Sequence, residues 1–408
     1  MQAIQEDKLT SRITDHIPSL TALINDNPTP HLNVSRGELG TILYFFYLER
    51  VTGQEQWGQE AHTRLQKLLK LLMDDSATDM MNPTLASGLA GLGMTLEVLI
   101  NEGFIADQYH DFLKRLDQYV FEHALKKIKK GNTDLLHGGT GGFHYLYYRL
   151  ERNPDVHNYL VEYVRSLPDI TQPFSEGAFF RNTYVSHISL PGEVNLGLSH
   201  GMAATILVLL NLYEAGVEEK LTELLIRKYI GFITYHKNAG KYESGKHAVF
   251  PNTVIVNERG HSETTEGSYQ GGLRWCYGDM NMTHLLYKAA ALLGEPEWFE
   301  LATETGLASL AITDFAHARC HGSLFCHGAT GIAHYYDYLA RISGLEEYRA
   351  GYRYWMEAAF AEFKKEKADG LYIDISAYFL EGSVGSGLVL LNALLDEPGY
   401  WEKIWLLS

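Results

Sequence analysis

The sequence has few cysteines, no long hydrophobic run and no cluster of positive charge, and each absence excludes a class of protein. Three cysteines in 408 residues cannot build a disulfide framework, so we expect free thiols in a reducing, cytoplasmic environment. The longest apolar run, near residues 203–210, is about half of the ~20 residues that span a bilayer. Residues 1–8 lack the apolar core of a signal peptide. A net charge of −16 argues against nucleic acid and stable membrane insertion, which leaves at most peripheral association with a membrane complex.

What the chain does have is a small-residue signature that occurs seven times. The first glycines of successive signatures are 51, 50, 63, 77, 50 and 54 residues apart, and each signature precedes an apolar run. The glycines by themselves require no more than close packing of helices. The signatures are Gly37–Gly40, Gly88–Gly91, Gly138–Gly141, Gly201–Ala204, Gly278–Asn281, Gly328–Gly331 and Gly382–Gly385.

Amphipathic segments alternate with these apolar runs. In residues 64–72, 112–120 and 221–227, apolar side chains recur every three or four positions with charges between them, which is typical of a helix that covers a core on one side. The runs after the signatures are apolar almost all round, as expected of helices without a water-facing side. We therefore predict a single all-α domain over residues 1–408. It is an α/α toroid of seven inner and seven outer helices, with residues 8–25 supplying the outer helix that closes the ring.

Two intervals exceed the period of about 50 residues, and the excess predicts insertions at about 168–196 and 238–273. Both contain turn-forming residues and short β-like runs, and both lead into the start of an inner helix. We expect them to lie over the mouth of the ring, where long loops commonly bind ligands. The second insertion, which precedes Cys276, is expected to form part of a peptide-binding surface.

Aligning the repeats on their first glycine brings polar residues together at that mouth. The position before the glycine holds His137, His200, Tyr277 and His327, and the position before that holds Leu136, Ser199, Cys276 and Cys326. Cys276 and Cys326 are 50 residues apart, so both thiols should lie at the same end of neighbouring repeats. Two thiols and the adjacent His327 are ligands that suit zinc with one position left open.

Two further sets of residues need an interpretation. Cys320-His321-Gly322 duplicates Cys326-His327-Gly328, but only the second copy has the glycine turn, the apolar helix and the 50-residue spacing, so we assign the first to a connection. Seven residues after His137, Tyr277 and His327 lie three more histidines. We interpret these as hydrogen-bonded side chains in a crowded interior. They are His144, His284 and His334.

Three motifs resemble the lanthionine synthetase C-like family: Trp275-Cys276-Tyr277-Gly278, Cys326-His327-Gly328 and Leu196-Gly197-Leu198-Ser199-His200-Gly201. The seven-fold glycine pattern extends the resemblance over essentially the whole chain. The resemblance implies one zinc ion held by Cys276, Cys326 and His327. It also implies a catalytic His200, an acidic partner Asp134 with His137 close by as a competitor, and a role for Tyr277 near the metal. We expect Arg274, His137 and Trp275 to contact substrate.

The reaction implied by the resemblance adds a peptide cysteine to dehydroalanine or dehydrobutyrine, giving (methyl)lanthionine thioether rings in a ribosomally made precursor peptide. A dehydratase and a transporter are conceivable partners. Two other functions stay open: a relative that adds glutathione to dehydrated residues, and a non-catalytic zinc toroid that binds peptides or thiols. A glycosidase-like toroid ranks last, because the mouth carries thiols and histidines instead of paired carboxylates.

The chain departs from the family pattern at two places. Family cyclases commonly carry an arginine four residues before the first zinc cysteine, where this chain has Gly272, with Arg274 nearby. They also often continue Cys-Tyr-Gly-x-Pro-Gly, whereas here Gly278 is followed by Asp279-Met280-Asn281.

Overall fold

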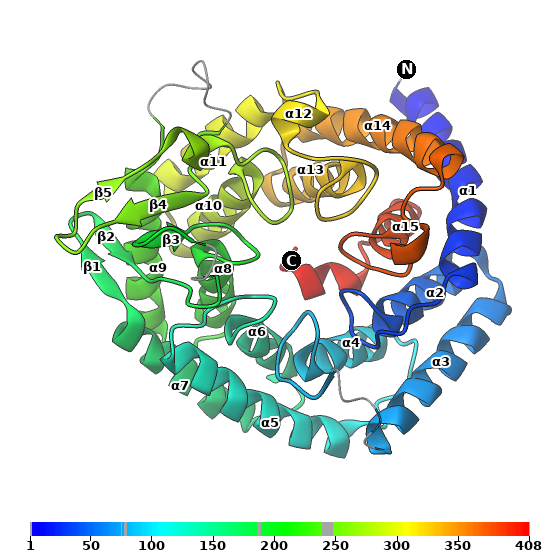
Figure 1. Ribbon diagram of the computed structural model, residues 1–408, viewed down its shortest axis with the longest axis horizontal. Coiled ribbons are helices and arrows are strands. Elements are labelled where there is room, and N and C mark those ends of the chain that lie inside the picture. The colour runs from blue at the N-terminus through cyan, green and yellow to red at the C-terminus, as the bar shows by residue number, and fades with distance from the viewer. Residues whose placement is uncertain (1, 75, 77–79, 186–188, 239–247, 408) are drawn as a thin grey trace.

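The computed structural model describes residues 2–74, 76, 80–185, 189–238 and 248–407, and it forms two concentric rings of helices (Figure 1). The predicted toroid of seven inner and seven outer helices is confirmed. The inner helices are α2 (Glu38–Thr52), α4 (Leu89–Asn101), α6 (Thr140–Arg149), α8 (Met202–Glu214), α10 (Asp279–Leu293), α13 (Ala329–Ser343) and α15 (Ser383–Asn392). The outer helices are α1 (Gln2–Asp26), α3 (Glu55–Met73), α5 (His110–Lys129), α7 (Val156–Ser166), α9 (Glu219–Tyr235), α11 (Pro296–Ser309) and α14 (Tyr348–Asp369).

Each ring follows from its hydrophobic pattern. Helix α8 buries an unbroken stretch, 202–212, because it is enclosed on all sides. Helix α3 buries only Gly58, Ala61, Leu65 and Leu68, one stripe with spacings of three and four. Helix α1 packs against α15 and so closes the outer ring, as predicted.

Steric contacts explain why the fourth residue of the signature is small. A Cβ at Gly331 would collide with the carbonyl oxygen of Phe325, and a Cβ at Gly385 would collide with that of Phe379. In both repeats the collision is with the carbonyl six residues earlier, because the loop before the helix folds back over its first turn. Glycine therefore sets the distance between loop and helix as well as that between helices.

Short strands occupy the two predicted insertions. Strands β1 (Gln172–Phe174) and β2 (Gly177–Phe179) form an antiparallel hairpin. Strands β3 (Glu193–Asn195), β4 (Thr253–Val256) and β5 (Ser262–Glu263) form an antiparallel sheet in that order, so the sheet joins one insertion to the other. Residues 186–188 and 239–247 of the insertions lie outside the described residues. The remaining short helices are η2 (Leu167–Ile170), η3 (Glu266–Tyr269), α12 (Phe315–Ala318), η4 (Ile373–Ile375) and η5 (Tyr400–Trp405).

The last of these helices, η5, was not predicted, and it lies at the centre of the ring (Figure 1). Its Trp401 and Trp405 side chains are fully buried. Two histidines of the predicted interior layer contact it: Nε2 of His144 lies 2.7 Å from the carbonyl oxygen of Lys403, and Nε2 of His334 lies 3.2 Å from Oε1 of Glu402. The third, His284, has its Nε2 2.8 Å from the hydroxyl of Tyr338. The hydrogen bonds confirm the interpretation for His144 and His284, whereas the Nε2 of His334 makes an ion-pair contact without a hydrogen bond among the described residues.

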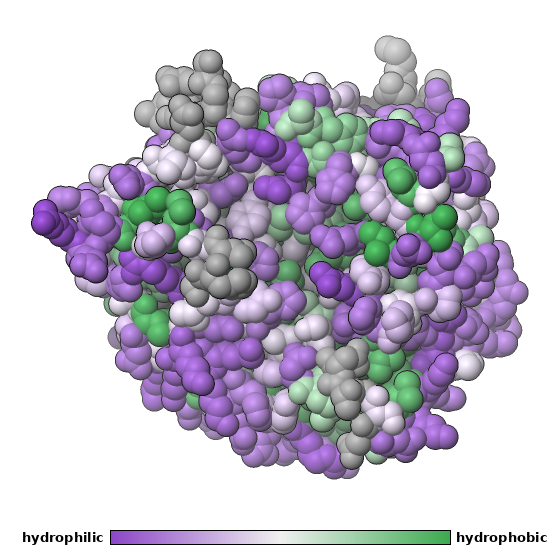
Figure 2. Space-filling view, viewed as in Figure 1, coloured by the Kyte–Doolittle hydropathy of each residue, from purple (hydrophilic) through white to green (hydrophobic). Residues whose placement is uncertain are grey.

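Hydrophilic residues cover most of the face seen in Figure 2, and the hydrophobic ones are scattered between them. Within the part of the chain that the structure describes, every helix is too short or too polar to cross a membrane.

Candidate metal centre and active site

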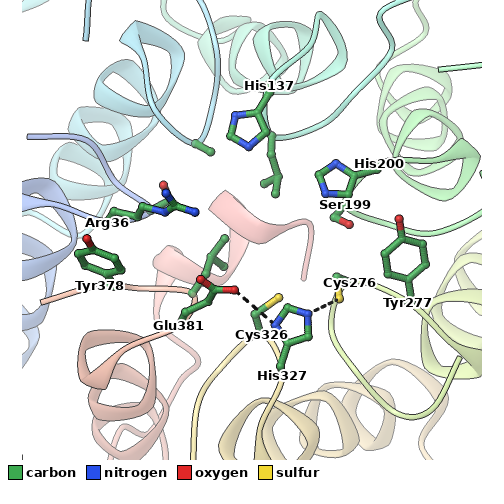
Figure 3. A pocket seen from close by; sticks show the side chains of 14 residues that line it. Arg36, His137, Ser199, His200, Cys276, Tyr277, Cys326, His327, Tyr378 and Glu381 are labelled. Carbon is green, nitrogen blue, oxygen red and sulfur yellow. Dashed lines mark hydrogen bonds and ion pairs between the residues drawn. The ribbon is translucent and has the colours of Figure 1, made fainter. Parts of the chain in front are cut away.

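A cavity of about 190 Å³ opens at the mouth of the ring (Figure 3), and the repeat determines its lining. Apart from Tyr378, every lining residue occupies one of the two positions that precede the first glycine of a signature. The position before the glycine contributes Arg36, His137, His200, Tyr277, His327 and Glu381, and the one before it contributes Ser35, Ala86, Leu136, Ser199, Cys276, Cys326 and Leu380.

Backbone hydrogen bonds between successive loops hold these positions in register. The bond from the N–H of Trp275 to the carbonyl of Cys326 places the two cysteines side by side, although 50 residues separate them in sequence. Residues at the same position of successive repeats therefore lie close together in space. Other bonds of this kind join Ser35 N to Ala86 O (3.2 Å), Ala86 N to Leu136 O (3.0 Å), Leu198 N to Cys276 O (2.9 Å), Cys326 N to Leu380 O (2.8 Å) and Phe379 N to Ser35 O (2.9 Å).

The sulfur atoms of Cys276 and Cys326 and a ring nitrogen of His327 lie within 4.8 Å of one another. The distance from Cys276 Sγ to His327 Nε2 is 3.4 Å. Around a tetrahedral zinc with Zn–S near ~2.3 Å and Zn–N near ~2.0 Å, sulfur and nitrogen ligands would be about 3.5 Å apart. Both thiols are almost fully buried and the imidazole is half-buried at the cavity. The three residues could thus hold a metal ion, and both their chemistry and their spacing fit zinc.

The protonation of this group also fits a cation. A hydrogen bond from Cys326 lowers the pKa of Cys276 well below its usual value against the effect of burial, and His327 adds to the lowering. The same hydrogen bond, with burial, raises the pKa of Cys326. The hydrogen bond to Cys276 raises the pKa of His327. A thiolate that a neighbouring thiol and an imidazole stabilise favours the binding of a cation.

Cys320 differs from the other two cysteines. Burial raises the pKa of its thiol to about 12, and among the described residues it does not belong to the group that could hold a metal. Its neighbour His321 donates its backbone N–H to the carbonyl of His327 at 2.7 Å. The geometry therefore agrees with the assignment of Cys320 and His321 to a connecting loop.

His200 and Asp134 form a hydrogen-bonded pair beside the thiols. Oδ2 of Asp134 lies 2.6 Å from Nδ1 of His200, and the carboxylate is fully buried. Its Oδ1 accepts the backbone N–H groups of Leu136 (2.9 Å) and His137 (2.8 Å), while Nδ2 of Asn182 donates to Oδ2 at 3.0 Å. With Nδ1 engaged by Asp134, the free nitrogen of His200 is Nε2, and the side chain lines the cavity.

Burial and hydrogen bonding act in opposite directions on His200. Burial lowers its pKa, but the hydrogen bond to Asp134 and the charges of Asp134 and Cys276 outweigh that effect, so the pKa is raised. For His137 burial dominates and lowers the pKa, and its ring lies 6.4 Å from that of His200. The structure thus pairs Asp134 with His200, and places His137 as a separate, mostly neutral wall of the cavity.

The other predicted site residues are divided between the cavity and the core. The Tyr277 hydroxyl accepts a hydrogen bond from Nδ2 of Asn195 at 2.8 Å, and burial raises its pKa to about 12. The guanidinium carbon of Arg274 lies 5.7 Å from the Tyr277 ring centre. Trp275 is 1% exposed and donates its Nε1–H to the carbonyl of Trp405 at 3.1 Å. It supports the thiols from behind, so it does not belong to the surface that a substrate would touch.

The departure at Gly272 has a local cause, and Asp279, at the variable position of the second motif, makes a contact of its own. Gly272 has φ of +67°, and a Cβ there would collide with the carbonyl of Ala318, so a side chain is excluded at that position. Asp279, which begins α10, accepts the backbone N–H groups of Val249 (2.8 Å) and Phe250 (2.9 Å). The carboxylate thereby ties the second insertion to the start of an inner helix.

Several residues of the site were missed from the sequence. Arg36 and Glu381 occupy the position before the first glycine in the first and last repeats, so extending the same alignment to all repeats would have found them. Tyr378 and Asn182 lie outside that alignment. Asn182 comes from the first insertion, and its Nδ2 also donates to the carbonyl of His200 at 2.8 Å.

The fold and the site together define an α/α toroid with a Cys-Cys-His group at its mouth. The chain matches the sequence model of the lanthionine synthetase C-like proteins over residues 30–406, and it belongs to that family. The solved structure of nisin cyclase superposes with a TM-score of 0.73, at 19% sequence identity and over 97% of each chain. At that identity the similarity shows the fold. No curated protein matches the sequence.

Proposed function

We propose that this protein is a lanthionine synthetase that adds cysteine thiols to dehydroalanine or dehydrobutyrine in a ribosomally made precursor peptide. The observation that carries the proposal is that the Cys276–Cys326–His327 group and His200, which the buried Asp134 holds by a hydrogen bond, line one small cavity. The addition needs a thiolate and a proton donor close together, and these two groups would provide them.

The proposed metal is one zinc ion, held by Cys276, Cys326 and His327 with one position open. When bound there, zinc supplies the acidity that keeps a peptide thiol as thiolate near neutral pH. Two anionic cysteine ligands reduce the electrophilicity of the metal, which favours thiolate delivery over activation of water.

The proposed steps balance without an oxidant or a reductant. The peptide sulfur bonds to the β-carbon of the dehydro residue, and the π electrons move onto the carbonyl as an enolate. The thiol proton is released to solvent when the thiolate forms. His200, protonated and oriented by Asp134, gives a proton from Nε2 to the α-carbon, the carbonyl forms again, and His200 takes a proton from solvent before the next turnover. Tyr277, whose pKa is raised to about 12, keeps its proton and supports the wall between His200 and Cys276.

The surroundings of the cavity fit the same proposal. We propose that residues 1–408 act as one domain, in which the insertions at about 168–196 and 238–273 guide the peptide to the mouth. His137 and Arg274 are the proposed substrate contacts outside the metal group. Free thiols favour a cytoplasmic location. Association with a dehydratase and a transporter, and so with a membrane complex, belongs to the same proposal.

A test uses zinc-loaded protein and synthetic peptides that carry one cysteine and one dehydroalanine at varied spacing. Ring closure is an isomerisation, so peptide mass should stay constant while alkylatable thiol disappears. Fragmentation should show the ring pattern, because some rings close without enzyme. An unchanged rate and ring pattern would refute the cyclase proposal and favour a toroid that only binds peptides or thiols. Mass gain from added glutathione would instead indicate a glutathione-adding enzyme.

A further inference from the structure

Arg36 is a cavity residue for which the proposed reaction has so far given no role. It lies across the cavity from His200 and Tyr277, and its side chain extends inward (Figure 3). Its backbone is fixed on both sides: the N–H donates to Oδ1 of the buried Asn33 at 2.9 Å, and the carbonyl accepts from Oγ1 of Thr29 at 3.1 Å.

The charge of Arg36 is not neutralised by the protein. It is the sole arginine or lysine among the residues that line the cavity. Within the described part of the chain, its guanidinium group has no carboxylate partner, although the chain carries a net charge of −16. The lining carboxylate, Glu381, lies toward His327, with its Oε1 3.8 Å from Nδ1. Arg36 is exposed to solvent at the open cavity, and an unpaired guanidinium there provides a site for negative charge.

We infer that Arg36 binds the carbonyl oxygen of the dehydro residue and stabilises the negative charge that develops on it during addition. The inference rests on the proposed function. The β-carbon must reach the sulfur held at Cys276, Cys326 and His327, and the α-carbon must reach Nε2 of His200. The carbonyl bonded to the α-carbon then points to the remaining wall, and that wall carries Arg36.

Electrostatics support the same role. The cavity is lined by the thiol group and the carboxylate of Glu381, and the buried carboxylate of Asp134 lies behind His200, so a further negative charge on the enolate oxygen needs a cation close by. Arg36 is near enough to His137 for its charge to act on that ring: burial lowers the pKa of His137, and Arg36 contributes to the lowering. A positive group aimed at the position where charge develops accelerates the step without binding the ground state more tightly.

The experiment compares Arg36→Gln and Arg36→Lys with the wild-type protein in the cyclisation assay. We expect Arg36→Gln to lower kcat about 10²–10³-fold, as removal of a single oxyanion donor does, and Lys to restore part of the loss. Binding is measured separately with a peptide in which alanine replaces dehydroalanine, so that no charge develops. Its Kd should change less than twofold, and zinc content should be unchanged. Arg115→Gln on α5 removes the same charge from an exposed position and should leave kcat at the wild-type value.

Two results would overturn the inference while leaving the cyclase proposal standing. Wild-type kcat in Arg36→Gln would show that the charge is not used. A loss of affinity for the alanine peptide equal to the loss of kcat would show that Arg36 holds an anionic group of the peptide and not the developing enolate. Failure of the wild-type protein to close rings would refute the proposed function itself.

Discussion

The buried carboxylate of Asp134 fixes His200 through a single 2.6 Å hydrogen bond to Nδ1, and that leaves Nε2 as the nitrogen available to the cavity. Because backbone N–H groups and Asn182 satisfy the remaining lone pairs of Asp134, the orientation of His200 is set by the fold before any substrate arrives. The predictions below start from this pair and from the neighbouring thiols.

Removal of the imidazole should abolish proton transfer without disturbing the metal group. We expect His200→Ala to retain one zinc and to lose about 10²–10⁴-fold in turnover, the usual contribution of a general acid. Zinc content by metal analysis and the rate of thiol loss provide the two measurements. His137→Ala is the matched control on the same wall, and an equal loss in that variant would contradict the assignment of the acid to His200.

The raised pKa of His200 predicts the direction of a pH effect. Asp134 keeps the imidazole protonated above its ordinary pKa of about 6.5, so enzymatic ring closure should decline only as pH rises through the raised value. Asp134→Asn removes the charge, so the decline should move to lower pH. Rates are corrected for closure without enzyme. Identical pH profiles for the two proteins would argue against His200 as the acid.

The same pair should affect stability, with a sign that follows from the shift. Because the pKa of His200 is higher in the folded protein than in the unfolded chain, the stabilisation is complete below the unfolded pKa and is lost as pH rises through the folded one. The difference in unfolding free energy between wild type and Asp134→Asn should therefore shrink toward alkaline pH. Chemical denaturation at several pH values would measure it.

The two similar Cys-His-Gly motifs should behave oppositely in metal analysis. Cys326→Ala, like Cys276→Ala and His327→Ala, should remove zinc, because two remaining ligands bind it weakly. Cys320→Ala should keep one zinc and lose only about 1 kcal/mol of stability, as for a small deletion in the core. Loss of zinc from Cys320→Ala together with retention in Cys326→Ala would reverse the assignment.

Glu381 should act on the metal group through His327. Its Oε1 is 3.8 Å from Nδ1, on the side of the ring away from Cys276. Loss of a carboxylate that is hydrogen-bonded to a ligating histidine typically weakens metal affinity about 10–100-fold, and the longer ion-pair contact of Glu381 should give the low end of that range. We expect a loss in that range for Glu381→Gln in a chelator competition assay. Glu297→Gln, an exposed residue of α11, is the control that changes the net charge equally.

An arginine placed at Gly272, where the family pattern has one, should fail to increase activity. The left-handed backbone costs a side chain about 1–3 kcal/mol, and the collision with Ala318 adds to this. Gly294→Ala separates the two effects, because Gly294 has φ of +69° with open space around it. We expect Gly272→Arg to lower the thermal midpoint more than Gly294→Ala does. Equal midpoints would show that the loop can move away from the new side chain.

The sequence predicts the ring and the metal group well because both depend on a local pattern that repeats. Each signature glycine marks the place where a loop folds back on its own helix, and this contact spans only six residues. Cys276 and Cys326 could be predicted to lie together because backbone hydrogen bonds between successive loops bring residues at the same repeat position into contact. The same logic applies to Arg36 and Glu381, which were missed because the alignment was not extended to the first and last repeats.

The contacts that could not be predicted join segments that have no common pattern. Asn182 reaches Asp134 from an insertion, and its sequence neighbourhood contains no periodic signal. Asp134, and not His137, is the partner of His200 because its side chain points toward His200 from the loop. The spacing of residues in the sequence cannot predict that direction. Trp405 lies 130 residues from its partner Trp275 and outside every repeat.

The helix at the centre of the ring has a consequence for how a long peptide would be handled. Since η5 lies at the centre of the ring and its Trp401 and Trp405 side chains are fully buried, we infer that the toroid is closed at its centre and is not a tunnel. A chain cannot be threaded through it, so each segment must enter and leave by the same opening. The order in which successive rings form would then depend on how fast each peptide segment enters and leaves the cavity. A segment that already contains a closed ring would be too bulky to enter again easily.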